Sequence, residues 1–178
     1  EIEPDGAPNP SGIARTTLAY NIWYHLGLAH YLQGDYAGAL AAYAELLKTS
    51  AADNDDSIVA VTDWMWMSQM RLGHKAEAAA LLERITPQMD ILENDGYHRR
   101  LLMYKGIESP EALLNTDTAD TTTIATQGYG VANYYLVTGE TEKVKAVFAK
   151  ILGGAGWPAF GYIAAEVDMQ RLAQDGTL

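Results

Sequence analysis

Cysteine is absent from this chain of 178 residues. A disulfide framework and a thiolate metal site are therefore both excluded, because each needs cysteine sulfur. The absence does not fix a compartment, because many cytosolic and periplasmic proteins have no cysteine. Proline is scarce after residue 10, which removes the main breaker of helices. The hydrophobic content of 48% is enough for a real core and argues against disorder.

The chain also lacks an apolar run of about 18 residues, the length that would span a bilayer. Its most apolar stretch, residues 147–165, is interrupted by Lys150, by glycines and by Trp157-Pro158. We therefore expect a soluble protein without a membrane span.

Basic residues are few. Lysine and arginine number 12 against 23 acids, which gives a net charge of −11, and residues 1–57 carry 8 acids and 2 bases. Nucleic acid and anionic membranes both require clustered lysine and arginine. We therefore expect neither as a partner.

The first residues carry no initiator methionine and no signal peptide. We expect residues 1–12, which hold three prolines and two glycines, to form an extended N-terminal arm. The abrupt start at Glu1 is typical of a trimmed or processed fragment. The compartment, cytoplasmic or exported, stays open because a targeting signal would lie upstream.

Apolar residues recur at spacings of three and four along residues 13–33, which predicts one long helix. We expect Ser11 to cap this helix and Asp35 to cap a second one over residues 36–49. The stripe of the first helix consists of Leu18, Ile22, Leu26, Ala29 and Leu32. Further helices are predicted at 58–72, 75–85, 91–105, from Pro110, at 122–138, 141–152 and 159–173.

Four glycines end helices of this pattern, at intervals of 39, 33 and 33 residues: Gly34, Gly73, Gly106 and Gly139. A fixed period of this length indicates a stacked array of helical repeats. The predicted fold is all-α, with about nine helices in antiparallel hairpins and no strand. The hairpins cover about 13–49, 58–86, 91–115 and 122–152, with a terminal helix at 159–173, in a single domain over 13–178.

The first hairpin resembles a tetratricopeptide repeat. Six residues fall in register on the positions of that pattern: Trp23, Leu26, Gly27, Gly34, Ala39 and Tyr43. The resemblance covers about residues 18–152, with weaker matches in later repeats. It implies a right-handed superhelix closed by a C-terminal capping helix, and a chain similar to the C-terminal part of longer bacterial proteins of this family.

The resemblance also implies a binding groove, because the first helix of each hairpin lines the concave face in this family. The groove residues are then Asn21, Tyr24, Tyr31, Asp63, Met67, Met70, Arg71, Arg100, Tyr104, Tyr129 and Asn133. Tyrosine and arginine are enriched at binding hot spots, and methionine suits adaptable apolar contacts. Arg71 and Arg100 could grip a carboxylate. The alternative is that several of these residues pack against adjacent repeats.

Other chemistry finds little support. Residues 53–57 superficially resemble a calcium loop, but Ile58 and Trp64 stand where an EF-hand needs glycine and glutamate. His25 and His30 are five residues apart and do not share a helix face. The four tryptophans are expected in the core, and His98 with two arginines in a solvated or interface cluster. No nucleophile motif or phosphate loop is present, so we predict no catalytic residue, metal or cofactor.

Three functions follow. The leading one is a non-catalytic scaffold that binds a protein or peptide through the concave face, an argument by analogy. The second is a small all-helical hydrolase or carbohydrate-acting module, recognisable by two carboxylates converging in an aromatic cleft. The third is self-assembly, either as a homo-oligomer or by docking on missing N-terminal repeats through an uncapped apolar end.

Overall fold

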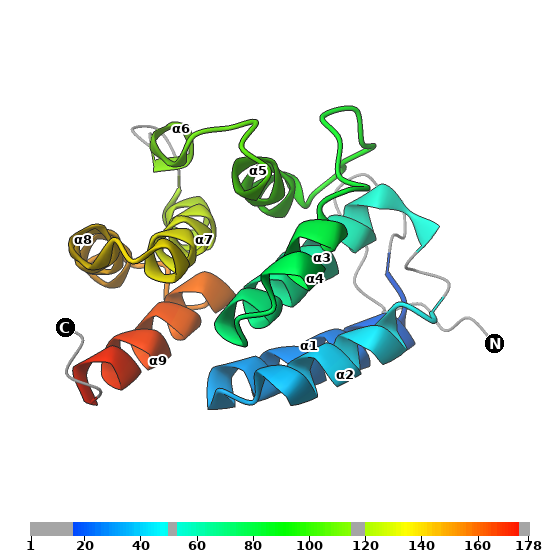
Figure 1. Ribbon diagram of the computed structural model, residues 1–178, viewed down its shortest axis with the longest axis horizontal. Coiled ribbons are helices and arrows are strands. Elements are labelled where there is room, and N and C mark those ends of the chain that lie inside the picture. Colours follow the sequence, from blue (N-terminus) through cyan, green and yellow to red (C-terminus); the bar gives the residue numbers. More distant parts are fainter. Residues whose placement is uncertain (1–15, 50–52, 115–119, 175–178) are drawn as a thin grey trace. The chain divides into compact units, whose positions relative to one another are not determined.

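The computed structural model describes residues 16–49, 53–114 and 120–174. Every regular element among these residues is an α-helix, as Figure 1 shows. The helices are α1 Leu18–Gln33, α2 Tyr36–Leu46, α3 Asp55–Arg71, α4 Lys75–Leu81, α5 Asp95–Tyr104, α6 Pro110–Leu114, α7 Thr121–Thr138, α8 Thr141–Leu152 and α9 Phe160–Gln174. The predicted all-α fold of helical hairpins is therefore confirmed.

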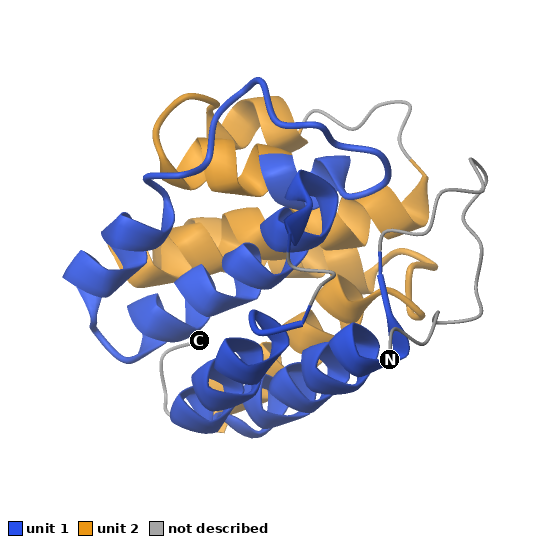
Figure 2. Cartoon of the chain, turned by 90° about the vertical axis from the view of Figure 1, so that its right-hand side faces the viewer, with its two compact units in different colours: residues 1–98 blue, residues 99–178 orange. Residues whose placement is uncertain are grey.

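The chain forms two compact units, residues 1–98 and residues 99–178, coloured blue and orange in Figure 2. The first unit holds α1 to α4 and the start of α5, and the second holds the rest of α5 and α6 to α9. A single domain over residues 13–178 and a superhelical stack of all hairpins stay predictions. The expected arm at residues 1–12 lies outside the described residues.

Several helix ends differ from the prediction because capping and tertiary contacts outweigh the apolar pattern. The helix expected from residue 13 begins at Leu18, and its cap is Thr17, whose Oγ1 accepts from the Tyr20 amide at 3.1 Å. The expected cap Ser11 lies outside the described residues. The helix expected from residue 91 begins only at Asp95. The predicted cap Asp35 is confirmed, since its side chain accepts from the Gly38 amide.

The four turn glycines end helices as predicted. All have positive φ, between 79° and 83°, and they are the residues with positive φ among those described. At the end of α1, the amide of Gly34 donates to the Tyr31 carbonyl at 2.9 Å and the next amide donates to the His30 carbonyl. This left-handed closure is what lets the chain reverse within two residues, and glycine adopts it without a steric penalty.

In the first unit α1 packs against α2, α2 against α3, and α3 against α4. The closest approach is between Gly27 on α1 and Tyr43 on α2, where a Cβ at Gly27 would overlap the tyrosine ring. Ala39 on α2 is fully buried. The small residues of the repeat pattern therefore let the two helices of a hairpin approach closely, as their size predicts.

The buried face of α1 is not the apolar stripe that defined the helix. Leu18, Ile22 and Leu26 are 39%, 57% and 41% exposed. The buried face, about half a turn of the helix away, carries Tyr20, Tyr24, Gly27, Leu28 and Tyr31. Because α1 carries large apolar side chains on two opposite faces, its pattern identifies a helix without identifying which face is covered.

In the second unit α7 is the central helix and contacts α6, α8 and α9. Tyr129 of α7 donates a hydrogen bond of 2.8 Å to the Asp168 carboxylate of α9, and both side chains are buried. Arg171 also contacts Asp168 at 3.3 Å. The terminal helix is therefore joined to α7 by the buried Tyr129–Asp168 hydrogen bond as well as by packing.

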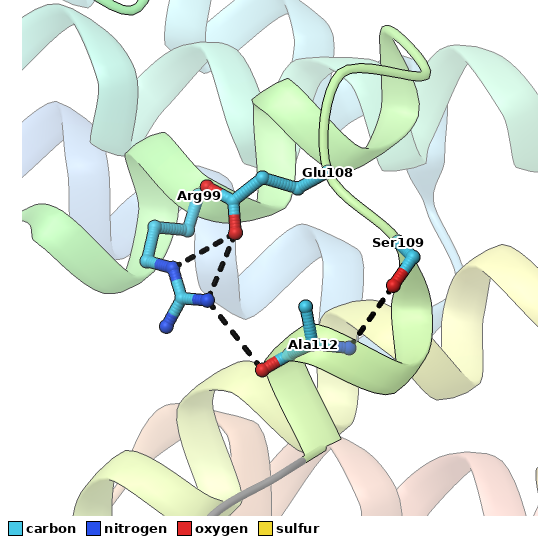
Figure 3. Close-up of polar contacts among 4 residues, drawn as sticks. All are labelled: Arg99, Glu108, Ser109 and Ala112. Atoms are coloured by element: carbon cyan, nitrogen blue, oxygen red, sulfur yellow. Dashed lines mark hydrogen bonds and ion pairs between the residues drawn. The ribbon is translucent and has the colours of Figure 1, made fainter.

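The hairpin of α5 and α6 is closed by an ion pair, drawn in Figure 3. Arg99 donates from Nε and Nη2 to one oxygen of Glu108 at 3.0 and 2.8 Å, and its Nη2 lies 3.5 Å from the carbonyl oxygen of Ala112. The hydroxyl of Ser109 accepts from the Ala112 amide at the start of α6. The second helix of this hairpin, α6, has five residues.

Candidate functional site

The eleven residues predicted to line a groove fall into two groups. Seven are buried: Tyr24, Tyr31, Asp63, Met67, Arg100, Tyr129 and Asn133. Four are partly exposed: Asn21, Met70, Arg71 and Tyr104. Ligand contact by these residues stays a prediction. The buried ones serve packing in the structure, and the accessible ones are those that a partner could reach directly.

The tyrosines of α1 join it to α3. The hydroxyl of Tyr20 donates to the carbonyl of Ser57 at 2.7 Å, and the hydroxyl of Tyr24 accepts from the indole Nε1 of Trp64 at 2.8 Å. Burial is the main reason that the pKa values of both tyrosines lie above their usual range, so both stay neutral at physiological pH. Tyr31 packs edge-on against Trp64, with ring centroids 5.0 Å apart.

Arg71 ends α3 beside the turn between α1 and α2. Its guanidinium carbon lies 5.8 Å from the ring centroid of Tyr36, which in turn packs edge-on against Tyr31 at 5.2 Å. A partly exposed arginine over an aromatic face is a common component of binding surfaces. Arg71 and Met70 therefore remain the accessible part of the predicted site on α3.

Arg100 fills the interior of the second unit. Its side chain is fully buried, donates to the carbonyl of Thr126 at 3.0 Å, and lies 6.0 Å from the ring centroid of Tyr129. A Cβ at Gly130 would overlap the Arg100 side chain, so this glycine provides the space for it. By contrast, Tyr104 is partly exposed and stacks on Tyr134 at 6.4 Å.

A groove lies on the other side of α3. It is bounded by the end of α2, by α3 and by α4, and its volume is about 470 Å³. The residues along it are Leu47, Ile58, Thr62, Met65, Gln69, Glu77, Ala80, Leu81, Glu83 and Arg84. Four of them, Ile58, Thr62, Met65 and Gln69, are spaced four, three and four residues apart and so share one face of α3. The predicted inner positions Asp63, Met67, Met70 and Arg71 lie on the opposite face.

The groove exists because α4 is short. The sequence predicted a helix over residues 75–85, but α4 ends at Leu81, whereas α3 runs for 17 residues. Leu82 and Ile85 turn back into the core instead of continuing the helix. The sequence pattern missed this groove because the apolar residues after position 81 continue the helical spacing.

The charged residues of the groove stand at its edge. Glu77, Glu83 and Arg84 are exposed, and the walls between them are mostly aliphatic. An apolar floor with a few charged groups at its edge is typical of a site that binds a peptide side chain and orients it by its flanking charges.

Side chains of the acidic segment at residues 53–57 bind backbone amides of the protein rather than a ligand. The side chain of Asn54 caps α3 by accepting from the Ser57 amide at 2.9 Å. Oδ1 of the buried Asp56 accepts from the amides of Leu92, Glu93 and Asn94 at 2.8, 2.9 and 3.1 Å. These bonds hold residues 92–94 as a loop, which explains why α5 begins later than predicted.

The histidines have protein partners. His25 Nδ1 lies 2.7 Å from the carbonyl of Asn21, and His30 Nδ1 lies 2.8 Å from the Asp35 carboxylate. His98 is buried, with Nε2 2.9 Å from the carbonyl of Thr86. The expectation was a solvated or interface cluster, and the solvated alternative is wrong for His98 and Arg100, because both side chains are buried. In the described part of the chain, no three histidine or acidic residues are grouped as a metal site would require.

The predicted core position is correct for some of the tryptophans and wrong for another. Trp64 and Trp66 are buried, which confirms their expected place in the core. Trp157 is 69% exposed, so the expectation of core packing is wrong there. It stands in the connection between α8 and α9, where no helix face directs it inward. Among the helices of residues 16–49, 53–114 and 120–174, none is long and apolar enough to cross a bilayer.

Antiparallel helical hairpins closed by left-handed glycines define this chain as an α-helical repeat protein. Residues 20–50, which include most of α1 and all of α2, match the family model of the tetratricopeptide repeat. The chain therefore contains a tetratricopeptide repeat in its first hairpin, and repeats of this family generally serve protein interaction rather than catalysis. Neither a curated protein nor a solved structure matches the chain.

Proposed function

We propose that this chain is a non-catalytic scaffold that binds a segment of another protein, and that the groove between α2, α3 and α4 receives that segment. The observation that carries the proposal is a tetratricopeptide repeat whose hairpin borders a groove of about 470 Å³. That volume suits one or two large side chains of a peptide.

The chemistry of the groove indicates the kind of segment. Leu47, Met65 and Leu81 offer aliphatic contacts, and methionine adapts to side chains of different shape. Glu77 and Glu83 at the edge favour a basic residue beside the apolar one. The occupant is therefore a short extended or helical segment with a large apolar side chain flanked by lysine or arginine.

The inner positions of the first unit that stay accessible form the second candidate surface for the same function. They are Asn21, Met70 and Arg71. Arg71 over Tyr36 is the observation that favours this surface, because arginine and tyrosine are frequent in binding hot spots.

A hydrolase or carbohydrate-acting module is less well supported. Such an activity would be recognised by two carboxylates that converge within about 5–10 Å in an aromatic cleft. The groove holds two exposed glutamates at its edge, and no aromatic side chain lines it.

Capture of partners from an extract of the source organism tests the function and the surface together. Ala80→Arg places a long side chain in the groove from an exposed position of α4, and Ala41→Arg adds the same charge at an exposed position of α2 outside the groove. We expect Ala80→Arg to release a partner that the parent chain and Ala41→Arg both retain.

The second surface is tested in the same assay by Arg71→Ala and Met70→Ala. Loss of the partner in these variants alone would assign binding to the inner face. Retention by all of the variants, or the absence of any reproducible partner, would contradict the proposed function.

A further inference from the structure

The three charged residues at the edge of the groove are not equivalent. Glu77 and Arg84 are exposed, and within the described part of the chain neither takes part in a salt bridge. Glu83 is also exposed, but it interacts with another group of the protein. The groove therefore offers a ligand one negative charge, at Glu77, and one positive charge, at Arg84.

These two charges stand at opposite ends of the groove. The helices α3 and α4 form an antiparallel hairpin with its turn at residues 72–74. Glu77 and Gln69 lie near this turn, whereas Arg84 follows the end of α4 and lies on the side of Ile58, at the start of α3. At a helical rise of about 1.5 Å per residue, the seven positions from Glu77 to Arg84 cover about 10 Å.

The middle of the groove is apolar. Met65 of α3 and Leu81 of α4 lie between the two charged ends and are both partly exposed. Thr62, beside Met65 on the same face of α3, is buried. A bound segment therefore meets a negative group, an apolar surface and a positive group in that order.

The polar residue at the turn end favours an extended segment. Nδ1 of His74 lies 2.9 Å from Oε1 of Gln69. Because Oε1 can only accept, His74 is the donor, and the amide nitrogen of Gln69 is left to donate to a ligand. An extended segment offers backbone carbonyls for such a bond, whereas the carbonyls inside a helix are already bonded within it.

We propose that the groove holds an extended segment in one orientation. Its lysine or arginine lies at Glu77, its large apolar side chain lies over Met65 and Leu81, and its aspartate or glutamate lies at Arg84. The inference rests on the proposed function, because it adds the order of residues in the segment that the groove receives. An extended segment rises about 3.3 Å per residue, so about 10 Å places its basic and acidic residues three positions apart.

The positive end gives the groove its selectivity. The chain has a net charge of −11, so its surface as a whole attracts basic peptides and repels acidic ones. A basic residue alone would therefore distinguish this groove poorly from other acidic parts of the surface. A segment that also carries an acidic residue at the right distance gains at Arg84 what it loses elsewhere, and this fixes both its place and its direction.

Selection of displayed random peptides on the full chain tests the order of residues. We expect the enriched peptides to share a basic and an acidic residue three positions apart, with a large apolar residue between them. Ala80→Arg, which fills the groove, should remove these peptides. If no enriched peptide depends on Ala80, both this inference and the proposed function are wrong.

Charge reversal tests the orientation. At low ionic strength Glu77→Lys should weaken an enriched peptide about fivefold, and replacing the basic residue of that peptide with glutamate should restore its affinity. Arg84→Glu should act in the same way on the acidic residue. Glu166→Lys makes the same change in net charge as Glu77→Lys at an exposed position of α9 and should leave the affinity unchanged.

Two results would overturn this inference and leave the proposed function standing. In the first, peptides that Ala80→Arg removes keep their affinity for both Glu77→Lys and Arg84→Glu. In the second, the enriched peptides carry their basic and acidic residues seven positions apart, the spacing that spans about 10 Å in a helix.

Discussion

The hydroxyl oxygen of Tyr24 accepts a hydrogen bond of 2.8 Å from the indole nitrogen Nε1 of Trp64, and both side chains are buried. This bond joins α1 of the first hairpin to α3 of the second. The repeat pattern predicts that Tyr24 lines a ligand groove, whereas in the structure Tyr24 is part of the interface between the two hairpins. The stability of the first unit should therefore depend on this hydroxyl group.

We predict that Tyr24→Phe lowers the free energy of unfolding by about 1–3 kcal/mol, because the buried indole N–H loses this acceptor while the ring remains. Urea denaturation of the full chain measures the change. Tyr36→Phe is the matched control: Tyr36 is partly exposed, and its ring contacts with Tyr31 and Arg71 survive the substitution. A Tyr24→Phe variant as stable as the control would show that the bond contributes nothing.

Gly27→Ala should destabilise the first hairpin by about 1–3 kcal/mol, although alanine is the better helix former. The added methyl group overlaps the ring of Tyr43, which is fully buried and cannot move aside freely. The double variant Gly27→Ala/Tyr43→Leu should cost less than the sum of the two single changes, because the smaller side chain relieves the overlap. Thermal denaturation of all four proteins measures this coupling, and simple additivity would refute a direct overlap.

Asp56→Ala should lower the free energy of unfolding by about 2–3 kcal/mol, since three backbone amides before α5 lose a charged acceptor. Asp53→Ala removes the same charge from an exposed position of the same acidic segment and should change stability by less than about 0.5 kcal/mol. Hydrogen exchange of residues 92–94 gives a second measure. Unchanged protection of these amides in Asp56→Ala would contradict the assigned role.

We predict that low pH destabilises α7, because its N-cap residue Asp120 then becomes protonated. Hydrogen bonds from the amide and hydroxyl of Thr123, together with the amide of Thr122, hold the pKa of Asp120 below the usual range of an aspartate. A lowered pKa in the folded state means that this stabilisation is present above the unfolded pKa and is lost as the pH falls through the folded one.

We therefore expect the melting temperature of the parent chain to fall more steeply below about pH 4 than that of Asp120→Asn, because asparagine also caps a helix but does not titrate. Other carboxylates, including Asp35 and Glu140, have lowered pKa values and remain in both proteins. The difference between the two acid profiles is the signal, and parallel profiles would contradict the role of Asp120.

The first hairpin could be predicted from the sequence because its turn and packing residues have few alternatives. Gly34 needs positive φ, Asp35 caps the next helix, and Gly27 provides the space that Tyr43 fills. These are local requirements of size and backbone geometry. They are visible in sequence spacing alone, and the family match over residues 20–50 agrees with them.

The candidate site was harder to predict because it depends on which face of each helix is covered. Apolar residues lie on two opposite faces of α1, and the sequence alone does not show which face is buried. The tyrosines were therefore predicted to line a groove, and the exposure of the leucine stripe was not predicted. The end of α4 and the late start of α5 depend on tertiary contacts, such as those of Asp56 with residues 36 to 38 positions away. Such contacts leave no mark in local periodicity.

Site-specific photo-crosslinking tests the scaffold function most directly. A benzophenone side chain at Ala80 stands at the groove, and the same group at Ala41 stands on α2 outside it. In an extract of the source organism, we expect a discrete covalent adduct with one protein from Ala80 and none from Ala41, mapped to a segment with a large apolar residue beside a basic one. Equal adducts from both positions, or none from Ala80, would contradict the claim that this groove binds a partner.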